Sequence, residues 1–286
     1  MTAFGQRLAA AIDQFGHLMV GIDPHPSQLA AWGLPDDASG LRQFGLRLVE
    51  ASAGRCPGVK PQSAFFERHG PSGVQALAEV LAAARSAGLV TLLDAKRGDI
   101  GSTMAGYGQA YLTDSSAFAV DALTVAPYLG FGSLTPIIDT ALTNGRGLFV
   151  LALTSNPEGS ALQLARRADG QTVAGAIAAA AAQSNAQEIA ARTPSQHTAL
   201  GSLGLVIGAT AGQALRQSEI DLCNLAGPVL APGFGAQGAT AATVHDLFRP
   251  VQHGLLVPSA RAISQFGPKK FDLIQAISQT NAELSF

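Results

Sequence analysis

Cysteine and charge are both scarce in this chain of 286 residues. The two cysteines, Cys56 and Cys223, lie far apart without CxxC spacing, which predicts no disulfide framework and fits a reducing compartment. Charged residues make up only 13% of the chain, with 18 Lys and Arg against 20 Asp and Glu. Because no long basic run occurs, nucleic acid is not an expected partner. None of the six histidines pairs with another at a metal-ligand spacing, so we expect no metal.

Long apolar runs are also missing. No stretch reaches the roughly 20 apolar residues that a membrane-spanning helix needs, so no membrane partner is expected. Residues 1–16 carry an Arg and an Asp and lack the apolar block of a signal peptide, which predicts a cytoplasmic protein. Hydrophobic residues nevertheless make up 47% of the chain, enough for a large core and against disorder. Such low charge suggests that another subunit covers part of the surface.

Short apolar segments alternate with segments of helical periodicity. The expected helices include residues 73–87, 133–143, 172–192 and 239–248. The expected strands are residues 17–22, 58–60, 89–93, 122–125, 148–153, 203–207, 228–231 and 254–257. Alternation predicts an α/β fold with a parallel sheet, and eight repeats in about 250 residues favour a TIM (β/α)8 barrel over an open doubly wound sheet. We expect one domain over residues 1–286, with an insertion of unknown role near 156–200, between strands five and six.

The segment from Asp94 to Asp99 (Asp-Ala-Lys-Arg-Gly-Asp) directly follows the third expected strand. Side chains two apart on a strand point the same way, so Asp94 and Lys96 should lie side by side. Arg97 and Gly98 should then end the strand and carry Asp99 onto a loop or helix start. Taken alone, the segment is either a surface ion-pair cluster or part of an active site, since ion-pair networks also perturb pKa values.

Polar residues follow several other expected strands. They are Asp23 after strand one, Lys60 after strand two, residues 154–157 after strand five, residues 232–238 after strand seven and residues 258–261 after strand eight. In a TIM barrel these positions meet on one face, where active sites of this fold are built. The arrangement favours an active site over a surface cluster.

A glycine-rich turn after strand seven and an arginine after strand eight predict a phosphate site. Pro232-Gly233-Phe234-Gly235 allows the backbone to approach a ligand closely, and Ser259-Ala260-Arg261 lies at the neighbouring strand end. Arg261 can add a bidentate, charge-assisted contact. We therefore expect a small phosphorylated substrate.

Together these motifs resemble those of orotidine 5'-monophosphate decarboxylase, over the chain from Asp23 to Arg261. The motifs are Gly-Ile-Asp at 21–23, Lys60, Asp-x-Lys-x-x-Asp at 94–99, Pro-Gly-x-Gly-x-Gln-Gly at 232–238 and Arg261. Residues 59–67 and 153–157 resemble the longer bacterial branch of that family. The resemblance implies a lyase that makes uridine 5'-monophosphate in pyrimidine biosynthesis. It also implies a homodimer that needs no metal or organic cofactor.

The resemblance further implies a role for each matching residue at the reacting carbon. Lys96 would donate a proton to C6 of the pyrimidine, and Asp94 would lie beside the departing carboxylate and hold Lys96. Asp99 would complete the Lys-Asp array from the other subunit, with Ile100 and Thr103 nearby.

Other matching residues would bind the rest of the nucleotide. Lys60 and Asp23 would bind ribose hydroxyls and help to fix the charged array, and Ser155 would contact the pyrimidine. Gln237 and Arg261 would bind phosphate, while the loop around Pro232 would close over the base. Gly235 and Ser259 belong to the predicted phosphate cradle.

The residue chemistry supports this interpretation independently. Decarboxylation leaves a carbanion with no ring system placed to delocalise it, so catalysis must come from preorganised charge that favours the transition state. Carboxylates beside Lys96 should keep it protonated, which argues against a Schiff base because that needs a neutral amine.

Two alternatives remain at this point. Sugar-phosphate barrels such as keto-gulonate phosphate decarboxylase or hexulose phosphate synthase share Asp-x-Lys-x-x-Asp but use magnesium, held partly by an acidic residue after strand two. Lys60 occupies that place here and would repel the ion. A catalytically silent nucleotide-binding barrel is the other, although phosphate binding alone needs neither Lys96 nor Asp94.

Overall fold

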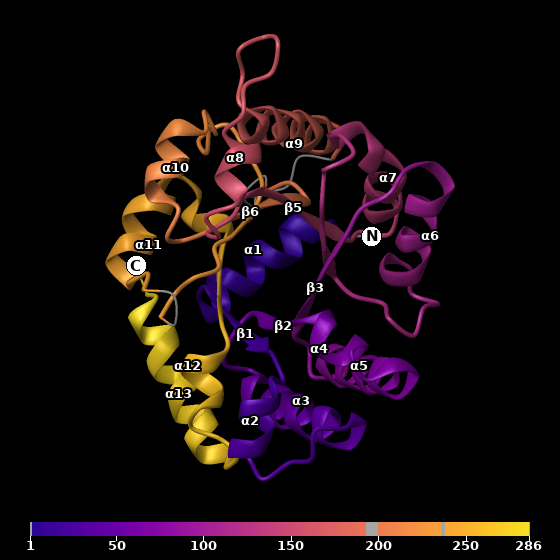
Figure 1. Ribbon diagram of the computed structural model, residues 1–286, viewed down its shortest axis with the longest axis vertical. Coiled ribbons are helices and arrows are strands. Elements are labelled where there is room, and N and C mark those ends of the chain that lie inside the picture. Colours follow the sequence, from indigo (N-terminus) through magenta and orange to yellow (C-terminus); the bar gives the residue numbers. More distant parts are fainter. Residues whose placement is uncertain (1, 193–199, 236–237, 286) are drawn as a thin grey trace.

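The computed structural model describes residues 2–192, 200–235 and 238–285. Eight parallel strands follow one another around a closed barrel, and β1 pairs with both β2 and β8 to close it (Figure 1). The strands are β1 (Leu18–Ile22), β2 (Gly58–Pro61), β3 (Val90–Arg97), β4 (Ala122–Val125), β5 (Gly147–Leu153), β6 (Leu203–Ile207), β7 (Val229–Leu230) and β8 (Leu255–Ser259). The predicted single-domain TIM barrel is confirmed.

Helices surround the barrel. The α-helices are α1 (Phe4–Phe15), α2 (Pro26–Ala31), α3 (Ala38–Ser52), α4 (Ser63–Glu67), α5 (Gly70–Ser86), α6 (Gly101–Leu112), α7 (Thr135–Thr143), α8 (Gly159–Gln163), α9 (Val173–Ala190), α10 (Gly212–Gln217), α11 (Ala241–Phe248), α12 (Arg261–Ser264) and α13 (Lys270–Glu283). In the described ranges, η1 (Phe131–Leu134) and η2 (Arg249–Gly254) are 3-10 helices. Polar side chains cap the amino-terminal ends of several helices. At the start of α9, the Thr172 hydroxyl accepts a hydrogen bond from the Gly175 amide (3.0 Å), which satisfies an N–H that has no partner within the helix.

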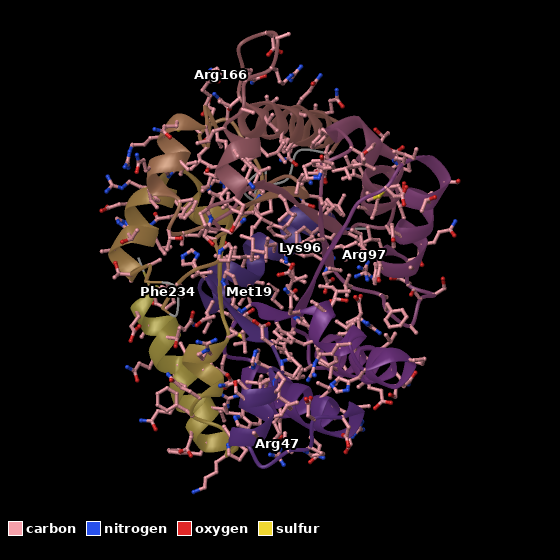
Figure 2. All side chains as sticks on the ribbon, viewed as in Figure 1. Met19, Arg47, Lys96, Arg97, Arg166 and Phe234 are labelled. Atoms are coloured by element: carbon pink, nitrogen blue, oxygen red, sulfur yellow. The ribbon has the colours of Figure 1, made fainter. Side chains whose placement is uncertain are left out.

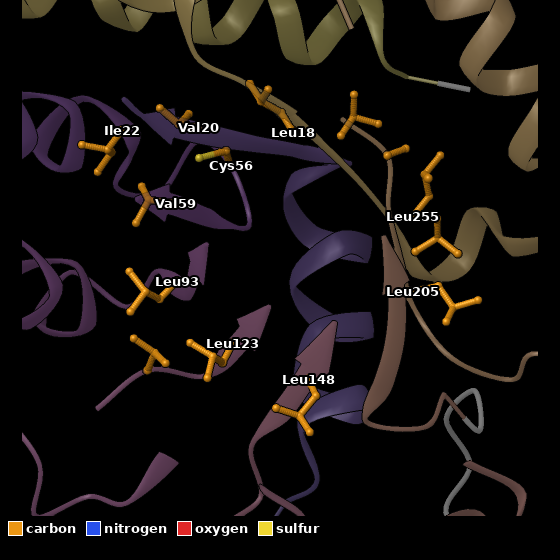
Figure 3. Close-up of a cluster of buried hydrophobic side chains, with 14 of the residues drawn as sticks. Leu18, Val20, Ile22, Cys56, Val59, Leu93, Leu123, Leu148, Leu205 and Leu255 are labelled. Carbon is orange, nitrogen blue, oxygen red and sulfur yellow. The ribbon is translucent and has the colours of Figure 1, made fainter. Parts of the chain in front are cut away.

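The strand side chains alternate between two cores. In β1, Leu18, Val20 and Ile22 pack outward against the helices, whereas Met19 points into the barrel. Figure 3 shows the outward-facing residues around the ring of strands. The same alternation places Ala122 and Thr124 of β4 on the inner face, with Leu123 and Val125 outside.

Helix α1 covers the amino-terminal ends of the strands. Phe4 is fully buried and meets Phe149 edge-to-face, with 6.2 Å between ring centroids. A Cβ on Gly147, the first residue of β5, would lie 2.1 Å from the Phe4 ring, so only glycine fits there. Because this end is filled, the opposite end of the barrel is left for a site.

Some boundaries differ from the sequence expectation. Strand three, expected to end at Leu93, continues to Arg97 through a register shift in its pairing with β4. The shift arises where Lys96 adopts a φ of +48°, a conformation that hydrophobic patterns do not reveal. Between β5 and β6 the structure places α8 and α9, whereas residues 193–199 of the expected insertion lie outside the described part of the chain.

Candidate active site

A cavity of about 550 Å³ opens at the carboxyl-terminal ends of the strands. Its charged lining residues come from β1, β2, β3 and β8 or the positions just after them: Asp23, Lys60, Asp94, Lys96 and Arg261. Figure 2 shows Lys96 near the middle of the barrel, with Arg97 on the opposite side of β3. Three cations and two carboxylates therefore face one cavity, as the strand-end argument predicts.

Asp94 lies at the centre of this charged group. Its Oδ1 accepts from Lys96 Nζ at 2.6 Å, and its Oδ2 accepts from Lys60 Nζ at 3.1 Å. Burial alone would raise the pKa of Asp94, but the two ammonium groups outweigh it and lower the pKa to about 2. The carboxylate is therefore ionised throughout the neutral range.

Lys60 is buried, with 7% of its surface exposed, and its ammonium lies between two carboxylates. Besides Asp94, it lies 3.9 Å from Asp23 Oδ1. Burial alone would lower the pKa of Lys60, but the charges of Asp23 and Asp94 more than compensate and raise it. Asp23 Oδ1 is itself buried and has no hydrogen-bond partner within the described residues, so it can accept one from a ligand hydroxyl.

Of the two lysines paired with Asp94, Lys96 is the more exposed. Its side chain is 45% exposed, compared with 8% for Lys60, while its Nζ stays on Asp94. Its positive φ turns the backbone between Asp94 and Arg97. The predicted pairing of Asp94 and Lys96 is therefore present, although the turn that produces it is not a regular strand.

Thr124 and Gln62 line the same cavity and were not among the predicted site residues. Thr124 donates its hydroxyl hydrogen to Asp94 Oδ1 at 3.0 Å. Gln62, with its amide turned to suit its neighbours, donates to the Asp94 carbonyl oxygen at 2.6 Å. Gln62 directly follows β2, so the rule that selected Lys60 could have selected it, but it carries no charge. Thr124 lies within β4, where the strand-end rule does not apply.

Arg97 faces away from the cavity. Its guanidinium pairs with Glu67, donates to the Tyr111 hydroxyl at 3.2 Å and lies 5.7 Å from the centre of the Tyr107 ring. Glu67 accepts from Ser63 as well, at 2.6 Å. This cluster anchors the outer side of the β3 turn on α4 and α6.

Some of the residues predicted to bind phosphate line the cavity. Pro232, Gly233 and Arg261 line it, and Gly233 has a φ of +116°, which favours glycine. Ser155 also lines the cavity. Gly235 instead borders a separate cavity beside α12 and α13, and Ser259 is buried behind the lining. Gln237 lies outside the described residues.

Asp99, Ile100 and Thr103 are not among the residues that line the cavity. They lie at the amino-terminal end of α6, where Asp99 Oδ1 accepts from the Ile100 amide at 2.8 Å. Ile100 is 60% exposed. Within one chain, then, Asp99 does not join Asp94 and Lys96.

Among the described residues, no group of three or more His, Cys, Asp or Glu side chains is arranged to hold a metal ion. The two carboxylates of the cavity each lie within 4 Å of a lysine ammonium. Magnesium prefers oxygen ligands without competing cations, so this donor set does not suit it. In the same described residues, no helix is long and apolar enough to cross a membrane.

Comparison with known families agrees with this geometry. The model of the orotidine 5'-phosphate decarboxylase / HUMPS family matches residues 16–247. The chain belongs to this family. Because the match includes β1 to β7 and all of the Asp94–Asp99 segment, it covers most of the charged site.

Similar members of the family are named consistently. A Salinispora arenicola protein named orotidine 5'-phosphate decarboxylase is 50% identical over 268 residues, covering 94% of this chain and 92% of that protein. A Streptomyces coelicolor protein of the same name is 49% identical over the same shares. A crystal structure of a Streptomyces avermitilis protein assigned to that activity has a TM-score of 0.91 and 46% identity, covering 99% of this chain and 95% of that one. These family members are carbon-carbon lyases.

Proposed function

We propose that this chain decarboxylates orotidine 5'-monophosphate to uridine 5'-monophosphate in de novo pyrimidine biosynthesis, in the cytoplasm and without a metal or organic cofactor. One observation carries the proposal: Lys96, Asp94 and Lys60 form a continuous chain of opposite charges in the cavity, with atoms 2.6 and 3.1 Å apart. A reaction that develops negative charge on carbon needs such a fixed ammonium. The names of the similar proteins point to the same substrate.

The reaction at C6 uses Lys96 and Asp94. The bond between C6 and the carboxylate breaks, carbon dioxide leaves, and the bonding electron pair stays on C6. The Lys96 ammonium stabilises that pair and then donates a proton to form the new C–H bond, after which water reprotonates the amine. Asp94 holds Lys96 and places negative charge beside the departing carboxylate, a repulsion that is relieved as carbon dioxide leaves.

The remaining residues bind the nucleotide. Asp23, whose Oδ1 accepts no hydrogen bond from the described residues, and the buried Lys60 bind ribose hydroxyls, and Ser155 contacts the pyrimidine. The phosphate is bound by the set Gln237, Arg261, Gly235 and Ser259, with the loop around Pro232 closing over the base. Binding energy from the phosphate offsets the cost of ordering these loops.

The proposal includes a homodimer in which Asp99 serves the partner's site. Ile100 and Thr103 accompany Asp99 on α6, outside the cavity of their own chain. Ile100 itself is exposed, and so is Tyr128 in the loop after β4, with 78% of its surface accessible. A Cβ on Gly98 would meet the Ala126 oxygen at 2.6 Å, so the two loops touch. A second copy would cover this surface.

We further infer that residues 1–286 form one domain that contains 156–200 as an insertion.

The test is turnover of orotidine 5'-monophosphate by the purified protein in EDTA, followed as loss of orotate absorbance. The proposal expects turnover that chelation does not reduce. A hexulose phosphate with magnesium serves as the competing substrate. Turnover of that sugar phosphate alone, or nucleotide binding without any product, would overturn the proposal.

A further inference from the structure

The Thr124 hydroxyl makes three hydrogen bonds, all to the segment that carries Asp94 and Lys96. It accepts from the Ala95 amide at 3.0 Å and the Lys96 amide at 2.9 Å, and it donates to Asp94 Oδ1 at 3.0 Å. A hydroxyl has one hydrogen and two lone pairs, so its capacity is fully used. Thr124 is only 1% exposed, and water therefore does not compete for these bonds.

The segment held in this way has an unusual backbone. β3 shifts its register against β4 between Leu93 and Arg97, and Lys96 has a φ of +48°. Non-glycine residues adopt this region at a cost and persist there only where the surroundings fix them. Thr124 binds the two amides just before the turn, so it sets the direction in which the Lys96 side chain leaves the backbone.

The same hydroxyl also orients the carboxylate. Asp94 Oδ1 is shared between Thr124 Oγ1 and Lys96 Nζ, whereas Oδ2 receives Lys60 Nζ. With donors on both oxygens, rotation of the carboxylate is restricted. The oxygen that holds the Lys96 ammonium is thus the one that Thr124 fixes.

We propose that Thr124 is a positioning residue for the decarboxylation: its hydroxyl holds the Asp94 carboxylate and the Lys96 backbone so that the ammonium meets the reacting carbon. Thr124 acts through these two residues. The inference rests on the proposed function, because it requires that Lys96 delivers a proton to the substrate. Small errors in such positioning reduce rate more than binding.

The decisive variants are Thr124→Val, which keeps the side-chain shape without the hydroxyl, and Thr124→Ser, which keeps the hydroxyl. For Thr124→Val we expect kcat to fall about tenfold to 100-fold with KM within about threefold of wild type. Thr124→Ser should retain kcat within about threefold. Binding of uridine 5'-monophosphate, which needs no proton transfer, should be nearly unchanged in both.

The chain offers a matched control in Thr91→Val. Thr91 is also fully buried, and its hydroxyl donates to Asp121 Oδ2 and accepts from the Asp121 amide, both at 3.0 Å, near the amino-terminal end of the barrel. Loss of this hydroxyl should lower the thermal midpoint but leave kcat unchanged. If Thr91→Val reduced kcat as much as Thr124→Val, the effect would be one of general stability and the proposal would fail.

The split between kcat and KM separates positioning from loss of folded protein. A mispositioned ammonium lowers the kcat of fully folded Thr124→Val and leaves its KM near that of wild type. Fewer folded molecules would lower the apparent kcat only in proportion to the folded fraction, which circular dichroism measures. Thr91→Val should keep the wild-type kcat per folded molecule.

Each outcome decides the inference. A Thr124→Val enzyme with wild-type kcat, or a Thr124→Ser enzyme as slow as Thr124→Val, would overturn it. If Thr124→Val does not fold, Thr124→Cys replaces the hydroxyl with a weak donor. The kcat of Thr124→Cys should then be lower than that of Thr124→Ser but still measurable. A wild-type kcat would overturn the inference. Failure of the wild type to turn over orotidine 5'-monophosphate would instead contradict the proposed function.

Discussion

At the scale of single residues, the site depends on one carboxylate that compensates two lysines. Removing either Lys60 or Lys96 would weaken the interaction that holds the pKa of Asp94 low, and removing Asp94 would leave Lys60 buried with only the more distant Asp23. Breaking a buried ion pair costs more than the pair contributes, because a buried charge remains without its partner.

Asp94→Asn should therefore destabilise the fold by about 3 kcal/mol at neutral pH. The folded pKa of about 2 lies below the ordinary 3.8, so the stabilisation from ionised Asp94 is complete above pH 3.8 and is lost as pH falls through 2. Urea unfolding of both proteins between pH 3 and 6 should give a constant difference above about pH 4 that shrinks below it. A difference that grows on acidification would contradict the pKa assigned to Asp94.

The sequence predicted the charged residues of the site better than the neutral ones. Asp94 and Lys96 were paired from their spacing, and Lys60 and Asp23 from their places at strand ends. Thr124 was missed because it lies inside an apolar strand segment and its hydroxyl matters only through the turn of the neighbouring strand. That turn depends on the φ of Lys96, which no residue pattern specifies.

At the scale of elements, the two ends of the barrel differ in structure. α1 fills the amino-terminal end through Phe4, while the cavity occupies the other end. Strand order and most helices followed from the alternation of apolar segments, but β3 runs four residues past its predicted end, from Leu93 to Arg97. The apolar pattern did not predict this extension, because residues 94, 96 and 97 are polar. They face the cavity and the α4–α6 cluster instead of an apolar core.

Phe4→Ala should lower the free energy of unfolding by about 3 to 5 kcal/mol, because it leaves a cavity in the barrel core. Its kcat should stay near that of wild type, since Phe4 lies at the end of the barrel away from the site. Denaturant titration and steady-state assays of the same preparation measure both. The exposed Phe271, changed to Ala, is the control and should change stability by less than about 0.5 kcal/mol. Equal changes in the free energy of unfolding for the two substitutions would contradict the role of α1 in filling the barrel core.

At the scale of the whole molecule, the role proposed for Asp99 would connect catalysis to assembly. One chain supplies Lys60, Asp94 and Lys96 to its cavity but keeps Asp99 outside it, beside exposed Ile100. The family resemblance implied that Asp99 acts from the other subunit, but the spacing alone could not, because residues three apart along a chain can serve one subunit or two. A shared site would make the dimer a requirement for activity.

Mixed dimers of Lys96→Ala and Asp99→Asn test this connection. Each variant alone should have very low activity, whereas a mixed dimer contains one cavity with both native residues. Random pairing at equal concentrations should restore about one quarter of the wild-type sites. Activity per site, with the mixed dimers quantified by two different affinity tags, is the measurement. Mixed dimers that form but stay inactive would show that Asp99 does not act across subunits.

The central claim, that a Lys96 ammonium drives a metal-free decarboxylation, is tested most directly by comparing wild type and Lys96→Ala with orotidine 5'-monophosphate in EDTA. The account predicts turnover by wild type and a loss of at least about 100-fold in kcat for the variant, because the proton donor is gone. Uridine 5'-monophosphate should still bind to the variant, which shows that its cavity is intact. Wild-type activity in Lys96→Ala would contradict the account.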